Sequence, residues 1–133
     1  MTAPAGSLHA TILIAEDHAD SRDALQAILE SAGYEVRLAH NGREAVERAE
    51  EVRPDLIVMD IMMPEVDGFE ATRRLRGRPG FENTPIIALT AMEGSRALTL
   101  AAGCNDHVLK PVNIRTFLEK VRDWLEAGGN HSN

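Results

Sequence analysis

The sequence predicts an α/β fold, a doubly wound parallel sheet of five strands covered by five helices. Four short apolar runs each end on a reactive polar residue, and helix-patterned stretches separate these runs. The runs are Ile12 to Ala15, ending on Glu16-Asp17; Leu56 to Met59, ending on Asp60; Ile86 to Leu89, ending on Thr90; and Val108-Leu109, ending on Lys110. Short runs of this kind are typical of buried parallel strands, and their strict alternation with helices predicts an open sheet covered on both faces.

The first half of the chain reads as βαβα. After the first strand, Asp20 is expected to be the N-cap of an amphipathic helix that ends at Gly33. The second strand is predicted over residues 34–39. Asn41 then caps a helix that runs through Val52, before Pro54 breaks the pattern ahead of the third strand.

The second half continues the alternation. Asp67-Gly68 opens a helix that runs to about Arg76, and Pro85 begins the fourth strand. A fourth helix is predicted over about 93–102 and a short fifth strand from about Asp106. Asn113 caps the last helix. Its apolar residues recur at helical spacing and should pack on the sheet: Ile114, Phe117, Leu118, Val121, Trp124 and Leu125.

Composition limits the class of protein. The 133 residues suit one domain, expected over 10–127, with small polar residues at 1–9 and 128–133 expected to form flexible tails. A net charge of −7 and a lack of long basic runs argue against nucleic-acid binding. The single cysteine, Cys104, excludes an internal disulfide, and no apolar run is long enough to span a membrane. We therefore expect a soluble cytoplasmic protein.

The polar residues that end the strands should meet, because parallel strands finish at one edge of their sheet. Glu16, Asp17 and Asp60 placed together would repel one another, so they must share a proton or hold a cation. Mg²⁺ suits a few carboxylates and keeps several waters, which fits these three acids. Zinc is not expected, because no Cys or His grouping has ligand spacing.

The same residues suggest phosphoryl chemistry. A carboxylate can accept a phosphoryl group as an acyl phosphate, a transfer that depends mainly on positioning and charge neutralisation. Lys110 offers a positive charge for phosphate oxygens, and Thr90 offers a hydroxyl donor. The set therefore predicts self-phosphorylation on Asp60.

Over about Thr11 to Glu126, these residues resemble the receiver domains of two-component response regulators. The resemblance is carried by four segments: Glu16-Asp17, Asp60-Ile61-Met62-Met63-Pro64 with Asp67-Gly68, Thr90-Ala91, and Lys110-Pro111. It implies a flavodoxin-like fold with strand order 2-1-3-4-5, a role in phosphorelay signal transduction, and a cis peptide bond between Lys110 and Pro111.

The resemblance also implies roles for the site residues. Asp60 would be the phospho-acceptor, forming 4-aspartylphosphate, and Thr90 with Lys110 would hold the phosphoryl group. The Mg²⁺ ligands would be Asp17, Asp60 and the backbone carbonyl of Met62, with Glu16 acting through water. The phosphoryl donor would be a histidine kinase or a histidine phosphotransfer protein.

Two features set this chain apart within the family, one at His107 and one at Met62 and Met92. His107 stands where the family usually has Tyr or Phe, so an aromatic switch coupled to Thr90 competes with a plain surface histidine. Met62 and Met92 occupy variable positions that tune phosphoryl lifetime, and neither can orient an attacking water. We expect a long-lived phosphate, which a half-life of seconds at saturating Mg²⁺ would contradict. His18 could border the site, although an exposed histidine near it is the simpler interpretation.

Other functions fit less well. A phosphatase resembling the haloacid dehalogenases needs a second acid two residues after the nucleophile, where this chain has Met62. A flavin-binding module needs a phosphate-binding loop rich in Ser, Thr or Gly after the first strand, and this sequence has no such loop there. An interaction protein that has lost phosphorylation would not need the whole acid, hydroxyl and lysine set. We expect a signalling domain rather than an enzyme acting on other substrates, with a protein target on the face made by residues 93–102, 106–109 and 114–125.

Overall fold

The computed structural model describes residues 10–63, 65–91 and 96–131. Its five strands form one parallel sheet in the order β2-β1-β3-β4-β5, which confirms the predicted fold class and strand order. The strands are β1 (Thr11–Ala15), β2 (Glu35–Ala39), β3 (Leu56–Asp60), β4 (Ile86–Thr90) and β5 (Asp106–Leu109). Each begins and ends within a residue or so of the expected position.

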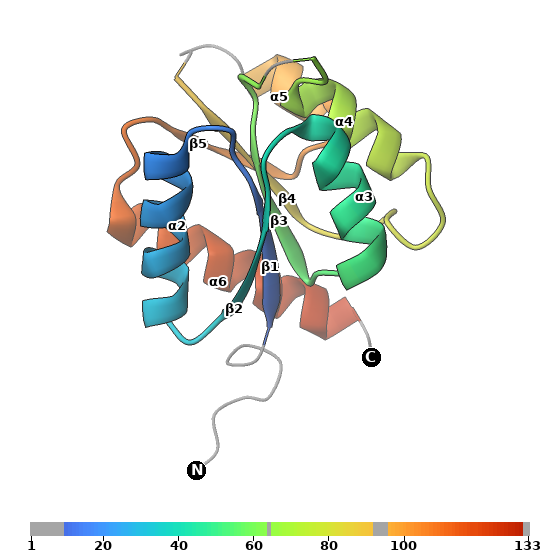
Figure 1. Ribbon diagram of the computed structural model, residues 1–133. Helices are drawn as coiled ribbons and strands as arrows, with labels where there is room; N and C mark the ends of the chain where they lie inside the picture. The colour runs from blue at the N-terminus through green and yellow to red at the C-terminus, as the bar shows by residue number, and fades with distance from the viewer. Residues whose placement is uncertain (1–9, 64, 92–95, 132–133) are drawn as a thin grey trace.

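Five helices cover the sheet: α2 (Ala19–Ser31), α3 (Gly42–Val52), α4 (Gly68–Arg76), α5 (Arg96–Ala102) and α6 (Ile114–His131). Figure 1 shows α2 and α6 on one face and α3, α4 and α5 on the other. The last helix continues to His131, past the domain end expected at residue 127. The expected tail 1–9, the start of the helix predicted from residue 93, Pro64 and Met92 lie outside the described residues.

The sheet separates two apolar cores, and alternate residues of each strand belong to different cores because strand side chains have a period of two. In β3, Leu56 and Val58 pack on the side of α2 and α6, whereas Ile57 and Met59 pack on the side of α3 and α4. All five β3 residues are buried, including Asp60 at the carboxyl end. The central strand therefore delivers a buried carboxylate to the edge of the sheet.

Helix starts at the carboxyl edge of the sheet were predicted with mixed success. Asn41 and Asp67 are N-caps as expected, since their side chains accept hydrogen bonds from the Glu44 and Glu70 amides at 2.8 and 2.9 Å. The predicted cap at Asp20 is wrong. Helix α2 begins at Ala19, and its N-cap is His18, which makes no side-chain capping bond.

The reason lies in how the first turn of α2 closes. The Arg22 amide donates to the His18 carbonyl at 2.9 Å, which starts the helix two residues before the expected position. Asp20 thus lies inside the first turn, where its negative charge still favours the positive end of the helix dipole. Tyr34, predicted as a strand residue, instead donates its amide to the Leu29 carbonyl at the exit of α2.

Strand β5 is tied to α6 by a carboxylate. Asp106 accepts hydrogen bonds from Lys120 Nζ and Trp124 Nε1, both at 2.9 Å, and Lys120 also donates to the His107 carbonyl at 3.1 Å. Burial by itself would raise the pKa of Asp106, but these donors outweigh it and lower the pKa. This network fixes the strand that leads into Lys110.

We expect Asp106→Asn to reduce the free energy of unfolding at neutral pH by about 1–2 kcal/mol, because the neutral amide loses a charge-assisted bond to Lys120. Because the pKa of Asp106 is lower in the native state, its carboxylate stabilises the fold at pH values above the unfolded pKa. This stabilisation is lost as the pH falls through the native pKa. The difference between wild type and variant in urea titrations should therefore shrink below about pH 4. A difference that is constant down to pH 2 would contradict the assignment.

Among the residues described, no helix has the length and apolar character needed to cross a membrane.

Candidate functional site

Three acids converge at the carboxyl edge of the central strands. Glu16 and Asp17 directly follow β1, and Asp60 is the last residue of β3. The side chains of Glu16 and Asp60 are 0% and 1% exposed, while that of Asp17 is 24% exposed. One potential ligand atom from each, together with one from His18, lies within 4.8 Å of the others. The structure thus brings together the acids that the sequence placed at two separate strand ends.

Lys110 supplies a positive charge to this cluster from the end of β5. Its Nζ lies 3.0 Å from Asp60 Oδ2 and 3.4 Å from Glu16 Oε1. Burial lowers the pKa of Lys110, but the hydrogen bond and charge of Asp60, with those of Glu16, outweigh that effect and raise it. Burial and the neighbouring Asp60 raise the pKa of Glu16. The Lys110 ammonium thus contacts two of the three acids, whereas the nearby Arg22 guanidinium donates to the backbone carbonyls of Glu16 and Asp17 rather than to a carboxylate.

Both oxygens of Asp60 are held in place. Oδ2 accepts from Lys110, and Oδ1 accepts from the backbone amide of Met62 at 3.1 Å. The loop after β3 is held in turn, because the Gly68 amide donates to the Ile61 carbonyl at 3.0 Å. A Cβ on Gly68 would lie 2.4 Å from the Asp60 carbonyl oxygen. Gly68 was expected only to start a helix, and the structure adds this close approach to the backbone of Asp60.

The two other predicted residues lie on β4 and β5. Thr90 is the fully buried last residue of β4, and its carbonyl accepts the Lys110 amide at 2.8 Å. The Lys110-Pro111 peptide bond is cis, as the resemblance implied. His107 is half-buried on β5, opposite Ala88, where it lines a groove beside α6.

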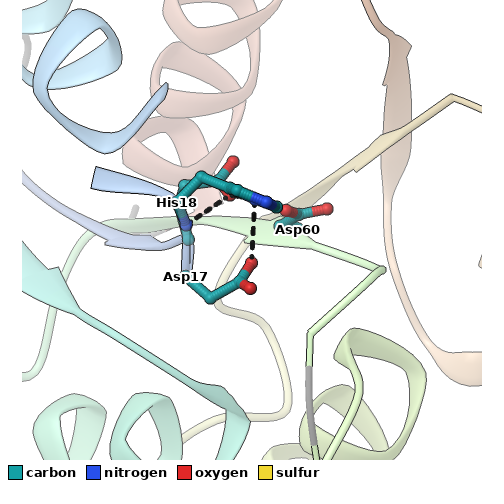
Figure 2. Close-up of side chains that lie close together, drawn as sticks. Asp17, His18 and Asp60 are labelled. Carbon is teal, nitrogen blue, oxygen red and sulfur yellow. Dashed lines mark hydrogen bonds and ion pairs between the residues drawn. The ribbon is translucent and has the colours of Figure 1, made fainter. Parts of the chain in front are cut away.

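His18 is the residue that sequence reasoning set aside. Its side chain is 74% exposed, as the simpler interpretation held, yet its Nδ1 lies 3.4 Å from Asp17 Oδ1 and 3.5 Å from Glu16 Oε2. Figure 2 shows the imidazole reaching over Asp17 toward Asp60. The available signal was its position, one residue after the paired acids at the end of β1.

The donor set fits a divalent cation. Asp17 Oδ1 is buried and makes no hydrogen bond, and its 3.4 Å approach to His18 is an ion-pair distance without hydrogen-bond geometry. A buried carboxylate oxygen without a hydrogen bond is costly unless a cation satisfies it. Carboxylate oxygens in excess of the local positive charge are the ligands that Mg²⁺ prefers.

Comparisons with known proteins agree with this arrangement. The family model described as "Response regulator receiver domain" matches residues 12–122. The polar-differentiation response regulator DivK of Brucella anthropi is 36% identical over 117 residues, covering 86% of this chain and 95% of that protein.

Solved structures are similar as well. One is the receiver domain of a sensor histidine kinase from Pseudomonas aeruginosa PAO1 with a magnesium ion coordinated in its active site cleft: 38% identity, TM-score 0.83, covering 89% of this chain and 98% of that one. Another is the receiver domain of the Saccharomyces cerevisiae response regulator Ssk1, crystallised with the histidine phosphotransfer protein Ypd1: 31% identity, TM-score 0.80, covering 87% and 88%. With its acid cluster, its topology and the match over residues 12–122, this chain belongs to the response regulator receiver domain family, the signalling domains of two-component systems.

Proposed function

We propose that Asp60 accepts a phosphoryl group from a histidine kinase or a histidine phosphotransfer protein in a Mg²⁺-dependent reaction. The phosphorylated chain then signals by binding another protein. The observation that carries this proposal is the buried Asp60 carboxylate, held on one oxygen by Lys110 and on the other by the Met62 amide, among acids that need a cation. The chemistry of the domain is confined to its own phosphorylation and dephosphorylation.

In the transfer, a carboxylate oxygen of Asp60 attacks the phosphorus atom. The bond from phosphorus to the donor's imidazole nitrogen breaks, and that nitrogen keeps the electron pair. Lys110 already contacts Asp60 Oδ2 at 3.0 Å, so its ammonium is placed to stay with the transferred oxygens. Mg²⁺, when bound, supplies the charge that neutralises these oxygens; Asp17, Asp60 and the Met62 carbonyl would hold it, with Glu16 acting through water.

Thr90 and His107 have proposed roles in reading the phosphoryl group. The Thr90 hydroxyl would bond a phosphoryl oxygen, since Thr90 ends the strand next to β3 and Asp60 pairs with the residue before it. Movement of Thr90 would reach β5 through the bond between its carbonyl and the Lys110 amide. His107, three residues earlier on β5, would respond as a planar but polar side chain.

Two similar structures support the proposed ion and donor. The Pseudomonas receiver domain is described with magnesium in its active site cleft, and the Ssk1 receiver domain with a histidine phosphotransfer protein. The direct test is incubation of the protein with acetyl phosphate and Mg²⁺, followed by intact-mass measurement. One phosphoryl group should be added, labile to hydroxylamine, and EDTA should prevent its addition. A phosphoryl group that is added in the presence of EDTA and is not removed by hydroxylamine would contradict an aspartyl phosphate.

The target is proposed to bind the face formed by α5, β5 and α6. Leu98, Leu100 and Leu109 are large apolar side chains exposed there, at 59%, 44% and 41%. Phosphorylation adds charge at one edge of the sheet, and a shift in population between two arrangements of this face would carry the signal.

We expect beryllofluoride with Mg²⁺, a mimic of the phosphoryl group, to shift the backbone amide resonances of Ala97, Leu98 and Leu100. The loop at 77–84 provides the internal control, because it lies at the amino edge of the sheet and should shift little. If saturation leaves the three α5 amides unmoved, the proposed coupling to this face fails.

A further inference from the structure

We propose that His18, beside Asp17 and Glu16, is an additional ligand of the metal site and gives it affinity for a late first-row transition ion, with Zn²⁺ as the probe, beyond that of a site built from oxygens alone. The proposal rests on the proposed metal binding at Asp17 and Asp60. It concerns which ions the site accepts.

The contacts divide the cluster into two sides. Lys110 occupies Glu16 Oε1 and Asp60 Oδ2, while the Met62 amide occupies Asp60 Oδ1. The other side presents Glu16 Oε2, the unbonded Asp17 Oδ1 and the imidazole of His18. An incoming cation therefore meets a nitrogen as well as carboxylate oxygens.

The separations suit a shared ion. His18 Nδ1 lies 3.4 Å from Asp17 Oδ1 and 3.5 Å from Glu16 Oε2. Two nitrogen or oxygen ligands of one tetrahedral zinc ion lie about 3.4 Å apart, given metal–ligand distances near 2.0–2.1 Å. The backbone at His18 is already fixed, because its amide donates to Glu16 Oε2 at 3.2 Å and its carbonyl starts helix α2. Only the exposed ring has to adjust.

An imidazole ligand should make the site distinguish between Mg²⁺ and late transition ions. Mg²⁺ prefers oxygen and keeps most of its water, so an imidazole adds little to its binding. Zinc, copper and nickel bind imidazole well and exceed magnesium-type ions in affinity for mixed nitrogen and oxygen sites. No Cys or His residues have the spacing of zinc ligands along the chain, yet the fold places His18 against the acid cluster.

The test is calorimetric titration of Zn²⁺ alone and of Mg²⁺ alone into wild type, His18→Asn and His40→Asn at a single pH. Asparagine is a good N-cap, so His18→Asn should leave α2 intact, which thermal unfolding can verify. His40 is the matched control, because it too is exposed and lies just after a strand, β2, at the same edge of the sheet.

We expect His18→Asn to lower the Zn²⁺ affinity about tenfold or more and the Mg²⁺ affinity by less than about threefold. His40→Asn should change neither. In the wild type, Zn²⁺ should shift the ring nitrogen resonances of His18 and leave those of His40 in place. Equal Zn²⁺ affinity in wild type and His18→Asn, or an unmoved His18 ring, would overturn the proposal.

The outcome can be separated from that of the proposed function. If the wild type accepts a phosphoryl group in Mg²⁺ but its Zn²⁺ binding is indifferent to His18, only the ligand role of His18 fails. If Zn²⁺ binding depends on His18 while Asp60 takes no phosphoryl group, the ligand role stands and the proposed function fails.

Discussion

Asp60→Asn is expected to abolish phosphoryl incorporation from both acetyl phosphate and a histidine kinase, with the protein still folded. The amide nitrogen and oxygen of asparagine cannot form the acyl phosphate that a carboxylate forms. Intact-mass measurement in Mg²⁺ should show one added phosphoryl group in the wild type and none in the variant. The loss should be complete, because the proposal gives no other residue the acceptor role.

A matched control separates the acceptor from a general effect of removing charge. Asp67→Asn also removes one acid from the loops at this edge, yet asparagine can keep the N-cap bond to the Glu70 amide. This variant should accept phosphate at nearly the wild-type rate. Phosphorylation of Asp60→Asn at the wild-type level, or its loss in Asp67→Asn alone, would contradict the assignment of Asp60.

Asp60→Asn should not destabilise the protein in the absence of Mg²⁺. Asp60 is one of the groups that raise the pKa of Glu16, so its neutralisation relieves repulsion inside the acid cluster. The opposing effect is that Lys110 loses its ion pair with the Asp60 carboxylate, although it keeps the ion pair with Glu16 Oε1 at 3.4 Å. We expect the free energy of unfolding to stay the same or rise, as is common where a site is built for function rather than stability.

Gly68→Ala should damage both stability and phosphorylation. The added Cβ would lie 2.4 Å from the Asp60 carbonyl oxygen and 2.8 Å from Ile61 Cα, so backbone atoms must move to admit it. Overpacking of this kind costs about 1–3 kcal/mol of unfolding free energy. The displaced strand end carries Asp60 itself, and misplacement of a reacting group should slow phosphorylation by about tenfold or more.

Gly128→Ala is the matched control, because a Cβ there meets nothing within 4 Å and the residue lies in helix α6. Alanine at this position should stabilise the protein by about 0.5–1 kcal/mol and leave phosphorylation unchanged. Urea unfolding and initial rates of phosphoryl incorporation measure both effects. A Gly68→Ala variant as stable and as active as wild type would show that the loop after β3 yields without cost.

Local patterns were sufficient for much of this molecule. The buried strands, the caps at Asn41 and Asp67 and the strict βα alternation follow from short-range rules of burial, capping and periodicity. The chain order of the elements then predicted one parallel sheet with its polar strand ends at a single edge. Asp20 shows the limit of such rules, since a good capping residue did not mark the helix start.

The tertiary structure decided which of these residues touch. Lys110 contacts Glu16 across 94 positions of sequence, a pairing set by the registers of β1 with β3, of β3 with β4 and of β4 with β5. The tertiary structure also places His18 against the acids, and it brings Gly68 so close to the backbone of Asp60 that no side chain fits at that position. The sequence by itself determined the elements and the residues at their ends, because those depend on neighbours along the chain. Contacts between elements depend on sheet register and packing, which no local pattern encodes.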